Sequence, residues 1–396
     1  MRRLEPARQQ YAWGSTSAIP ALLGRADDGA PWAEAWYGSH PAGPARVAEG
    51  AALSDLIDAE PERLLGEDII WRFGRRLPFL LKLIAPEQPL SLQVHPSQAQ
   101  AVEGYALEDE AGIALDHPSR NYKDANHKPE MVLALTRFQA VAGFRAPRRA
   151  VEVLAGLDSP LARRMRRTLR LNPTRYGIRQ VFSDVVSAAT RPSPQEIDAL
   201  VTEIAARFEA GTSPSLRVDS NVVKMAGTFP GDPGIAAALL LNPVTLQAGE
   251  ALFVPAGSVH AYISGLGVEV MASSDNVLRA GLTAKHIDVP EMLACVDYVA
   301  APPVRPAPEY LSRATRAYYA PVDDFELMVT TVVAADGRLP VPGRGPRILL
   351  AVEGAMTLVT QADTQTLAQG EAVFVGADER SLSVEGEGTL VQADVP

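Results

Sequence analysis

The ten residues TLQAGEALFV at positions 245–254 recur, without gaps, as TLAQGEAVFV at positions 366–375. Seven of the ten paired positions are identical. In each copy, apolar residues lie on both sides of a Gly-Glu pair, a pattern that is typical of two strands joined by a turn. A repeat of this kind indicates two related β units within one chain.

The first copy continues into a histidine that the second copy lacks. Residues 255–260 read Pro-Ala-Gly-Ser-Val-His and complete, from Gly249, the spacing G-x5-P-x-G-x2-H. This is the cupin pattern, in which a strand turns and delivers a metal-binding histidine, here His260. Ser381 takes the place of His260 in the second copy. We therefore expect a mainly β fold with a helical insertion: two cupin (jelly-roll-like) β-barrels, the second degenerate, plus an α-helical domain. The alternative is two unrelated strand-turn-strand segments that share a Gly-Glu turn.

Size and charge restrict the possible classes of protein. The 396 residues exceed what one compact core usually supports, so we expect two or three structural units. The formal net charge is -10, and no block of five like charges occurs. This charge argues against nucleic acid or an anionic membrane as a partner. An anionic substrate would need a local basic pocket.

Signals for export, membrane insertion and disulfide formation are weak. No apolar run follows the basic start of the chain, so we expect a cytoplasmic protein. The uncharged residues 251–268 include Pro255, Gly257 and His260, and we interpret them as strands joined by turns rather than a membrane helix. Cys295 is the only cysteine, so a metal would be held by His, Glu, Asp or an amide oxygen.

Patterns of apolar residues divide the chain into units. Residues 77–84 and 90–95 have the patterns of strands. Residues 193–196, Ser-Pro-Gln-Glu, form a capping box with proline at the first helical position, and apolar residues at helical spacing follow. Strand-like patterning returns from about Val222, and four prolines within residues 302–308 indicate a linker. We expect a catalytic cupin domain at residues 1–147 and 215–300, a helical insertion at 148–214 and a C-terminal degenerate cupin domain at 301–396.

The strand at residues 90–95 carries two candidate metal ligands. Its period of two places the apolar residues Leu90, Leu92 and Val94 on one face, and Gln93 and His95 on the other. A carboxamide oxygen and an imidazole can then converge on one ion. The alternative is a hydrogen-bonded structural histidine.

Residues 126–130, Asn-His-Lys-Pro-Glu, open a second apolar strand. If they are extended, Lys128 and Glu130 lie on one face. A charged loop is the alternative. Together with the strand at 90–95 and the cupin histidine, the possible ligand set is Gln93, His95, Glu130 and His260. These nitrogen and oxygen donors are compatible with Zn²⁺, and a single carboxylate leaves the ion a positive charge as an active Lewis acid.

Residues 265–285 form a further dense segment. Arg279 and Lys285 within it can bind phosphate or stabilise a developing negative charge. The alternative is a solvated loop.

Six separated stretches resemble the type I phosphomannose isomerases, in the same order and through most of the chain. They are YAWGS at residues 11–15, AEAWYGSHP at 33–41, LPFLLK at 77–82, LSLQVHP at 90–96, NHKPEM at 126–131 and SDNVLRAGLT at 274–283.

The resemblance implies a zinc-dependent aldose-ketose isomerase that interconverts mannose 6-phosphate and fructose 6-phosphate through a cis-enediol. It implies one Zn²⁺ per chain on Gln93, His95, Glu130 and His260, with Arg279 as the catalytic arginine. It also implies a role in mannose metabolism and GDP-mannose biosynthesis. We expect a monomer. The substrate pocket implied by the resemblance is lined by Ser91, Lys82, Lys128, Glu34, Trp36, Glu269 and Lys285.

The base that relays the proton between C2 and C1 stays open, with His127, Lys285 and Glu269 as candidates. One alternative function is another metal-dependent cupin enzyme, either an oxygenase or an isomerase of a different sugar phosphate. Another alternative is a nonenzymatic bicupin that stores or binds sugar.

Overall fold

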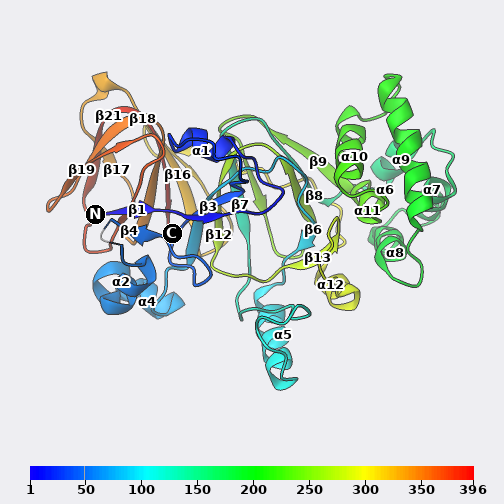
Figure 1. The fold of residues 1–396 in the computed structure, drawn as a ribbon, viewed down its shortest axis with the longest axis horizontal. Helices are drawn as coiled ribbons and strands as arrows, with labels where there is room; N and C mark the ends of the chain where they lie inside the picture. Colours follow the sequence, from blue (N-terminus) through cyan, green and yellow to red (C-terminus); the bar gives the residue numbers. More distant parts are fainter. Residues whose placement is uncertain (49) are drawn as a thin grey trace.

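Two antiparallel sheets form the centre of the molecule in the computed structural model, which describes residues 1–48 and 50–396 (Figure 1). The six-stranded sheet has the order β10 (Ala251–Val254), β7 (Glu130–Ala134), β12 (Gly267–Ala272), β5 (Phe79–Ile84), β3 (Glu34–Tyr37) and β2 (Ala7–Gln9). The five-stranded sheet has the order β13 (Leu278–Gly281), β6 (Leu92–Val94), β11 (His260–Ser264), β8 (Phe138–Phe144) and β9 (Leu241–Leu246).

The two central sheets share a hydrophobic cluster. Ile84 and Val132 from the six-stranded sheet pack in this cluster with Phe138 and Tyr262 from the five-stranded sheet. Because side chains alternate along a strand, Lys82 of β5 lies on the same face as Ile84. The strand period therefore places a lysine on a largely apolar interior face.

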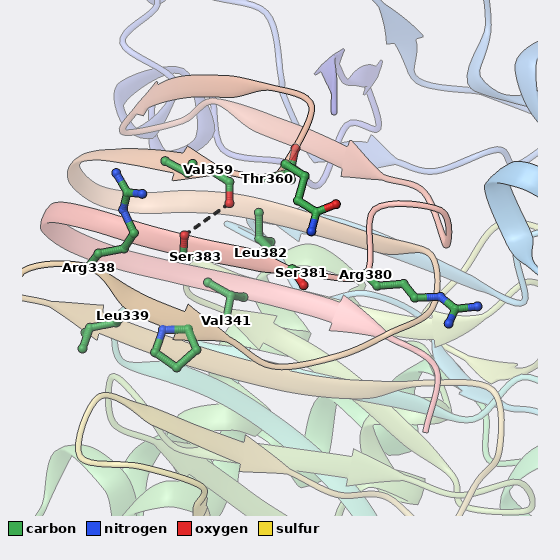
Figure 2. A pocket seen from close by; sticks show the side chains of 11 residues that line it. Arg338, Leu339, Val341, Val359, Thr360, Arg380, Ser381, Leu382 and Ser383 are labelled. Atoms are coloured by element: carbon green, nitrogen blue, oxygen red, sulfur yellow. Dashed lines mark hydrogen bonds between the residues drawn. The ribbon is translucent and has the colours of Figure 1, made fainter.

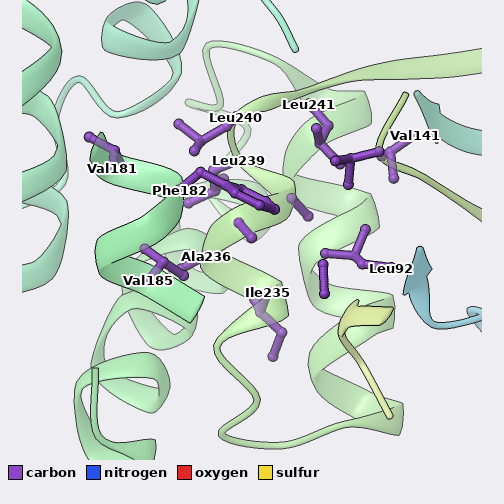
Figure 3. Close-up of a cluster of buried hydrophobic side chains, with 14 of the residues drawn as sticks. Leu92, Val141, Val181, Phe182, Val185, Ile235, Ala236, Leu239, Leu240 and Leu241 are labelled. Carbon is purple, nitrogen blue, oxygen red and sulfur yellow. The ribbon is translucent and has the colours of Figure 1, made fainter. Parts of the chain in front are cut away.

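Helices cover the other face of the five-stranded sheet (Figure 3). Leu92 and Val141 of the sheet share a hydrophobic cluster with Phe182 and Ile235 of the helices. The helical region consists of α6 (Pro147–Val153), α7 (Pro160–Leu171), α8 (Arg175–Val186), α9 (Pro194–Glu209), α10 (Leu216–Thr228) and α11 (Gly234–Ala238).

The capping box at residues 193–196 is confirmed at the start of α9. The Ser193 hydroxyl accepts a hydrogen bond from the Glu196 amide at 3.3 Å, and the Glu196 carboxylate accepts one from the Ser193 amide at 3.0 Å. The strand expected from about Val222 is wrong, since these residues belong to α10. Val218, Val222 and Met225 are buried at helical spacing in the cluster with the other helices, and the next strand begins only at Leu241.

A third, ten-stranded sheet contains the C-terminal strands and two strands from the N-terminus. Its order is β14 (Glu309–Tyr310), β15 (Thr315–Tyr318), β16 (Glu326–Val332), β21 (Leu382–Asp394), β18 (Arg347–Val359), β20 (Ala372–Val375), β1 (Arg2–Glu5) and β4 (Arg46–Val47), with β17 (Leu339–Val341) on β21 and β19 (Thr364–Ala368) on β18. The first residues of the chain therefore complete the sheet formed by its last residues, and both termini lie at this end of the molecule (Figure 1).

Strand β20 is buried on both faces. Val373 and Val375 pack inside the C-terminal sheet, whereas Phe374 packs in a cluster shared with the six-stranded sheet. That shared cluster contains Leu81 and Phe253 from the central sheet. The C-terminal sheet therefore covers the outer face of the six-stranded sheet.

The strands expected at residues 77–84 and 90–95 are present as β5 and β6, but Leu90 precedes β6 and packs against the cluster between the central sheets instead of with Leu92. No helix among the described residues is long and apolar enough to span a membrane. The remaining helices are α1 (Ala18–Leu22), α2 (Leu53–Ala59), α3 (Pro61–Leu65), α4 (Glu67–Phe73), α5 (Gln98–Glu110) and α12 (Val289–Cys295), with a short 3₁₀ turn at Ala334–Asp336.

Candidate metal centre and substrate cavity

Three predicted ligands from three strand ends converge. His95 follows β6, Glu130 begins β7 and His260 begins β11, and each residue is at most 2% exposed. The Glu130 carboxylate lies 3.2 Å from Nε2 of His95 and 3.3 Å from Nε2 of His260. The three candidate ligand atoms lie within 4.8 Å of one another. This spacing allows all three to coordinate one ion.

Both imidazoles are oriented by hydrogen bonds from Nδ1. His95 Nδ1 donates to the main-chain carbonyl of Asn276 at 2.8 Å, and His260 Nδ1 donates to that of Ser258 at 3.0 Å. The proton on Nδ1 leaves the Nε2 lone pair facing Glu130 on each ring. This is the tautomer that a metal-binding histidine needs.

Gln93, the fourth predicted ligand, is paired in register with His260 across β6 and β11. Its side-chain amide nitrogen lies 3.1 Å from Nε2 of His260. Rotation of the amide by half a turn places the oxygen there instead. The amide is therefore close enough to contribute an oxygen donor.

The electrostatics of the cluster favour a cation. Burial lowers the pKa of His95 to about 4, so this imidazole is neutral at pH 7. Burial raises the pKa of the Glu130 carboxyl, but Lys128 and the two histidines lower it by more. The net effect is a pKa well below the usual range. Nε2 of His95 and Oε2 of Glu130 are buried without a hydrogen-bond partner among the described residues. A Zn²⁺ ion would satisfy both atoms, so the donor set fits this metal.

A cavity of about 1030 Å³ adjoins the cluster, and Gln93 and Glu130 line it. Eight further residues singled out from the sequence also line it. They are Glu34, Trp36, Lys82, Ser91, Lys128, Glu269, Arg279 and Lys285.

Lysine and carboxylate side chains alternate along one wall of the cavity. Lys82 is paired in register with Trp36 on β3 and with Glu269 on β12, so the three side chains form a row across the sheet. Lys82 Nζ lies 3.4 Å from Glu269 and 3.8 Å from Glu34. The Trp36 indole donates to Glu34 at 2.6 Å. Lys128 Nζ likewise donates to Glu130 at 2.6 Å. Both lysines are thus neutralised by carboxylates.

Burial and nearby charges raise the pKa values of Glu269 and Lys82 on this wall. Burial, followed by the negative charge of Glu130, raises the pKa of Glu269 to about 7, although Lys82 opposes the shift. Burial lowers the pKa of Lys82, but Glu34, Glu269 and Glu130 raise it by more, so the ammonium stays charged. Glu269 is therefore balanced between its acid and its carboxylate at neutral pH.

Arg279 and Lys285 are cations without a carboxylate partner among the described residues. Arg279 on β13 is paired in register with Gln93, which places it next to the metal cluster across the five-stranded sheet. Burial lowers the pKa of Arg279, and burial together with Arg279 lowers that of Lys285. These two side chains give the cavity the local positive charge that an anionic substrate requires.

His127, the remaining predicted site residue, lies elsewhere. Its Nε2 is 2.8 Å from Oδ2 of Asp324, which precedes β16. Both residues line a different cavity of about 690 Å³. The structure therefore brings together every predicted site residue except His127, whose role as a base stays a prediction.

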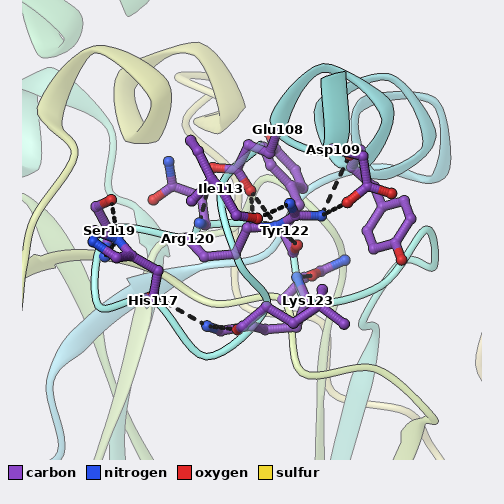
Figure 4. Close-up of polar contacts among 12 residues, drawn as sticks. Glu108, Asp109, Ile113, His117, Ser119, Arg120, Tyr122 and Lys123 are labelled. Carbon is purple, nitrogen blue, oxygen red and sulfur yellow. Dashed lines mark hydrogen bonds and ion pairs between the residues drawn. The ribbon is translucent and has the colours of Figure 1, made fainter. Parts of the chain in front are cut away.

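The segment between α5 and β7 adds cavity residues that the sequence reasoning missed (Figure 4). Leu115, Asp116 and Lys123 line the cavity. Arg120 braces this segment by donating to the carbonyls of Ile113 and Tyr122, both at 2.6 Å. Residues 111–125 have no periodic pattern and match no motif, so nothing in the sequence marked them.

Ser381, the counterpart of His260 in the repeat, has different surroundings (Figure 2). It is exposed and lines a cavity of about 620 Å³ in the C-terminal sheet, together with Arg338, Arg380 and Thr360. Neither histidine nor glutamate lines this cavity. It therefore lacks the histidine and glutamate donors of the central cluster.

Comparisons with known proteins agree with this arrangement. Residues 1–147 match the family model of the phosphomannose isomerase type I catalytic domain. The chain is 36% identical, over 99% of both chains, to a mannose-6-phosphate isomerase of Escherichia coli (strain K12). It is 34% identical to the mannose-6-phosphate isomerase of Homo sapiens, covering 95% of this chain and 93% of the relative.

Solved structures show the same likeness. The apo form of mannose 6-phosphate isomerase from Salmonella typhimurium is similar with a TM-score of 0.91 and 35% identity, covering 100% of this chain and 99% of the other. A mannose 6-phosphate isomerase bound with zinc and yttrium is similar with a TM-score of 0.90, at the same identity and coverage. The likeness therefore extends over the whole chain.

Proposed function

Because the chain belongs to the type I phosphomannose isomerase family, we propose that it interconverts mannose 6-phosphate and fructose 6-phosphate through a cis-enediol. The observation that carries this function is the buried cluster of His95, Glu130 and His260 beside a cavity lined by Arg279 and Lys285, which have no carboxylate partner among the described residues. An enzyme of this kind needs a Lewis-acid site for the sugar oxygens and a positive site for the phosphate.

The proposed metal is one Zn²⁺ per chain, held by Gln93, His95, Glu130 and His260. When bound, Zn²⁺ supplies a Lewis acid that lowers the energy of the enediol oxygens. The hydrogen bonds from Nδ1 hold both imidazoles with Nε2 directed at the site. Lys128 holds one oxygen of Glu130 and leaves the other available.

The substrate phosphate is proposed to bind Arg279 and Lys285. In a chain of net charge -10, these two cations can attract a dianion, whereas Lys82 and Lys128 are already paired with carboxylates. Arg279 also lies beside Gln93, so its guanidinium can stabilise the negative charge that develops on the sugar. Ser91, Glu34 and Trp36 complete the lining that orients the sugar.

Glu269 is the proposed base. Its pKa of about 7 suits a group that must accept the proton from C2 and return it to C1 at neutral pH. It lies on the cavity wall, and Lys82 holds its carboxylate in place. His127 is less well placed because its ring bonds to Asp324. Lys285 is instead proposed to bind the substrate phosphate.

For the architecture we propose two cupin barrels, one formed by the central sheets and a degenerate one formed by the C-terminal sheet. Domain limits follow the sequence analysis, with the helical unit extended through Ala238 because helices continue to that residue. A monomer with one bound zinc is the proposed working form. The cytoplasmic location stays a prediction.

A coupled assay that detects fructose 6-phosphate formed from mannose 6-phosphate tests this function. We expect activity that is lost on treatment with a chelator and restored by Zn²⁺. A panel of other hexose phosphates run in parallel measures the substrate preference. Full activity after complete removal of metal would contradict the zinc-dependent mechanism, and turnover of other sugars alone would contradict the substrate.

A further inference from the structure

Asn276 is a buried asparagine that belongs neither to the ligand set nor to the cavity lining. It lies in the connection between β12 and β13 and has 0% exposure. Burying a carboxamide is costly unless its donors and acceptors are satisfied. The hydrogen-bond partners of Asn276 therefore indicate its structural role.

The side chain of Asn276 binds the main chain of residues 123–126 at both ends of its amide. Oδ1 accepts hydrogen bonds from the amides of Lys123, at 2.7 Å, and Asp124, at 3.3 Å. Nδ2 donates to the carbonyls of Asp124, at 2.7 Å, and Asn126, at 2.8 Å, and to the Asp124 carboxylate at 3.3 Å. This segment continues through Lys128 to Glu130, four residues beyond Asn126.

The main chain of Asn276 binds the other side of the metal cluster. Its carbonyl accepts the hydrogen bond from Nδ1 of His95 at 2.8 Å. One residue therefore bonds to His95 through its backbone and, through its side chain, to the segment that leads to Glu130. These two ligands come from different sheets, and no strand pairing joins β6 to β7.

Neighbouring residues stiffen the same connection. The Ser274 hydroxyl donates to the Asn126 carbonyl at 3.1 Å and accepts from the Asn276 amide at 3.2 Å. The Asp275 amide donates to the Asp124 carboxylate at 2.8 Å. Residues 274–276 and 123–126 are thus joined by bonds from three consecutive residues.

We propose that Asn276 is a positioning residue that sets the separation of His95 and Glu130, and through it the affinity for zinc, without being a ligand. The inference rests on the zinc site of the proposed function. Partners that orient metal ligands typically change metal affinity by about 10- to 100-fold when they are removed. The donor and acceptor pattern of the amide matters because three of its hydrogen bonds require a donor and two require an acceptor.

Asn276→Asp tests this with almost no change in shape. The carboxylate keeps the acceptor for Lys123 but directs its second oxygen at the carbonyls of Asp124 and Asn126, which repel it. We expect zinc affinity, measured by competition with a chromophoric chelator, to fall about 10- to 100-fold. We also expect the visible absorption of the Co²⁺-substituted protein to change, because ligand geometry determines that spectrum.

Asn242→Asp is the matched control. The Asn242 amide also donates to main-chain carbonyls, those of Ala142, Gly143 and Ala301, but it bonds to no residue that holds His95 or Glu130. We expect this variant to lower the melting temperature and to leave zinc affinity and the Co²⁺ spectrum at wild-type values. Unchanged zinc affinity in Asn276→Asp, or an equal loss in both variants, would overturn the proposal.

A measurement on the wild-type protein keeps the test decisive if Asn276→Asp does not fold. Zinc should slow hydrogen exchange at the amides of Lys123 and Asp124, because both donate to the residue that holds His95. Exchange in α7, within the helical region, should not change. Equal exchange at residues 123–126 with and without zinc would contradict the inference. Isomerase activity is not read in these experiments, so their failure is distinct from failure of the proposed function.

Discussion

The two copies of the repeat fold alike at the turn and differ at the centre of each sheet. Gly249 and Gly370 have φ values of 82° and 85°, which favour glycine. In the first copy the Glu250 carboxylate accepts from the Gln247 amide at 2.7 Å, and in the second Glu371 accepts from Ala368 at 2.8 Å. The repeated sequence therefore specifies one local structure twice.

Strand register shows which residue of the second copy replaces the proposed carboxylate ligand. Val254 of β10 pairs with Glu130, and Val375, its counterpart in β20, pairs with Arg347. Arg347 is fully buried, and its guanidinium donates to the carbonyls of residues 342, 343 and 379 at 3.1, 2.7 and 2.8 Å. A cation that belongs to the chain thus lies where the first copy has an anionic ligand.

The same register relates two further positions. Glu269 is paired with Val132, and Gln392 with the equivalent Leu349, so a neutral amide replaces the proposed base. Beside Arg347 the interior of the second copy is tightly packed. A Cβ on Gly343 would lie 2.3 Å from the Asp394 carboxylate. The comparison teaches that the turn defines the fold of each unit, whereas single residues facing inward decide whether it can bind a metal.

Placing the second copy's residue in the first should have the largest effect. His260→Ser removes one of two imidazole ligands, so we expect loss of bound zinc and a fall in kcat of roughly 1000-fold or more. Metal analysis and the coupled assay measure both. Ser381→Ala is the control and should change neither quantity. Full zinc content with normal turnover in His260→Ser would remove His260 from the site.

A substitution at Arg279 should have the next largest effect. It tests whether this residue beside the first copy's metal cluster takes part in the chemistry. Arg279→Lys keeps the charge but loses the planar fork, so we expect kcat to fall about 100-fold with zinc content unchanged. Steady-state kinetics check this. A raised KM with normal kcat would show that Arg279 binds the ground state only.

Arg347→Met tests the idea that the second copy carries its own cation. Three partly buried carbonyls lose the donor that the buried guanidinium supplies, so we expect the free energy of unfolding to fall by about 3 kcal/mol, with one zinc still bound per chain. Chemical denaturation and metal analysis measure these changes. Arg380→Met, at an exposed position, is the matched control. Loss of zinc in Arg347→Met would mean that the two copies are not independent.

Glu269→Gln places the second copy's neutral amide in the first and should change the pH dependence of stability. A raised pKa means that the folded, metal-free protein holds a proton that the unfolded chain releases near pH 4.5. Its stabilising contribution is therefore present below pH 4.5 and is lost as the pH rises through about 7, by at most about 3 kcal/mol. His95, with its lowered pKa, has the opposite slope in both proteins, so the difference between their curves isolates Glu269. Parallel stability curves would contradict the assignment.

Ser381→His should have the smallest effect. A single imidazole cannot form a site in a cavity that neither histidine nor glutamate lines, so we expect the zinc content to remain one per chain. The change in unfolding free energy should be within about 0.5 kcal/mol because the position is exposed. A second tightly bound ion in this variant would show that the degenerate copy retains more ligands than the register indicates.

Local patterns determined a large part of this protein from the sequence alone. The Gly-Glu turns, the capping box of α9 and the inward face of β6 each depend on residues close together in the chain, where period and turn chemistry act directly. The ligand set followed from motifs of the same short range. The strand expected from about Val222 was wrong because valine is common in strands. Only packing against the other helices decides that Val222 lies in a helix, α10.

Contacts between distant segments decided the rest. The pairing of β1 with β20, the turn of His127 towards Asp324 and the match of Glu130 with Arg347 join residues that are hundreds of positions apart or depend on strand register. Lys123 reached the cavity wall because Arg120 and Asn276 brace a segment without any period of its own. The sequence by itself thus determined the kinds of groups at the site, and the tertiary structure alone decided their neighbours, because register and burial arise only when the sheets pack together.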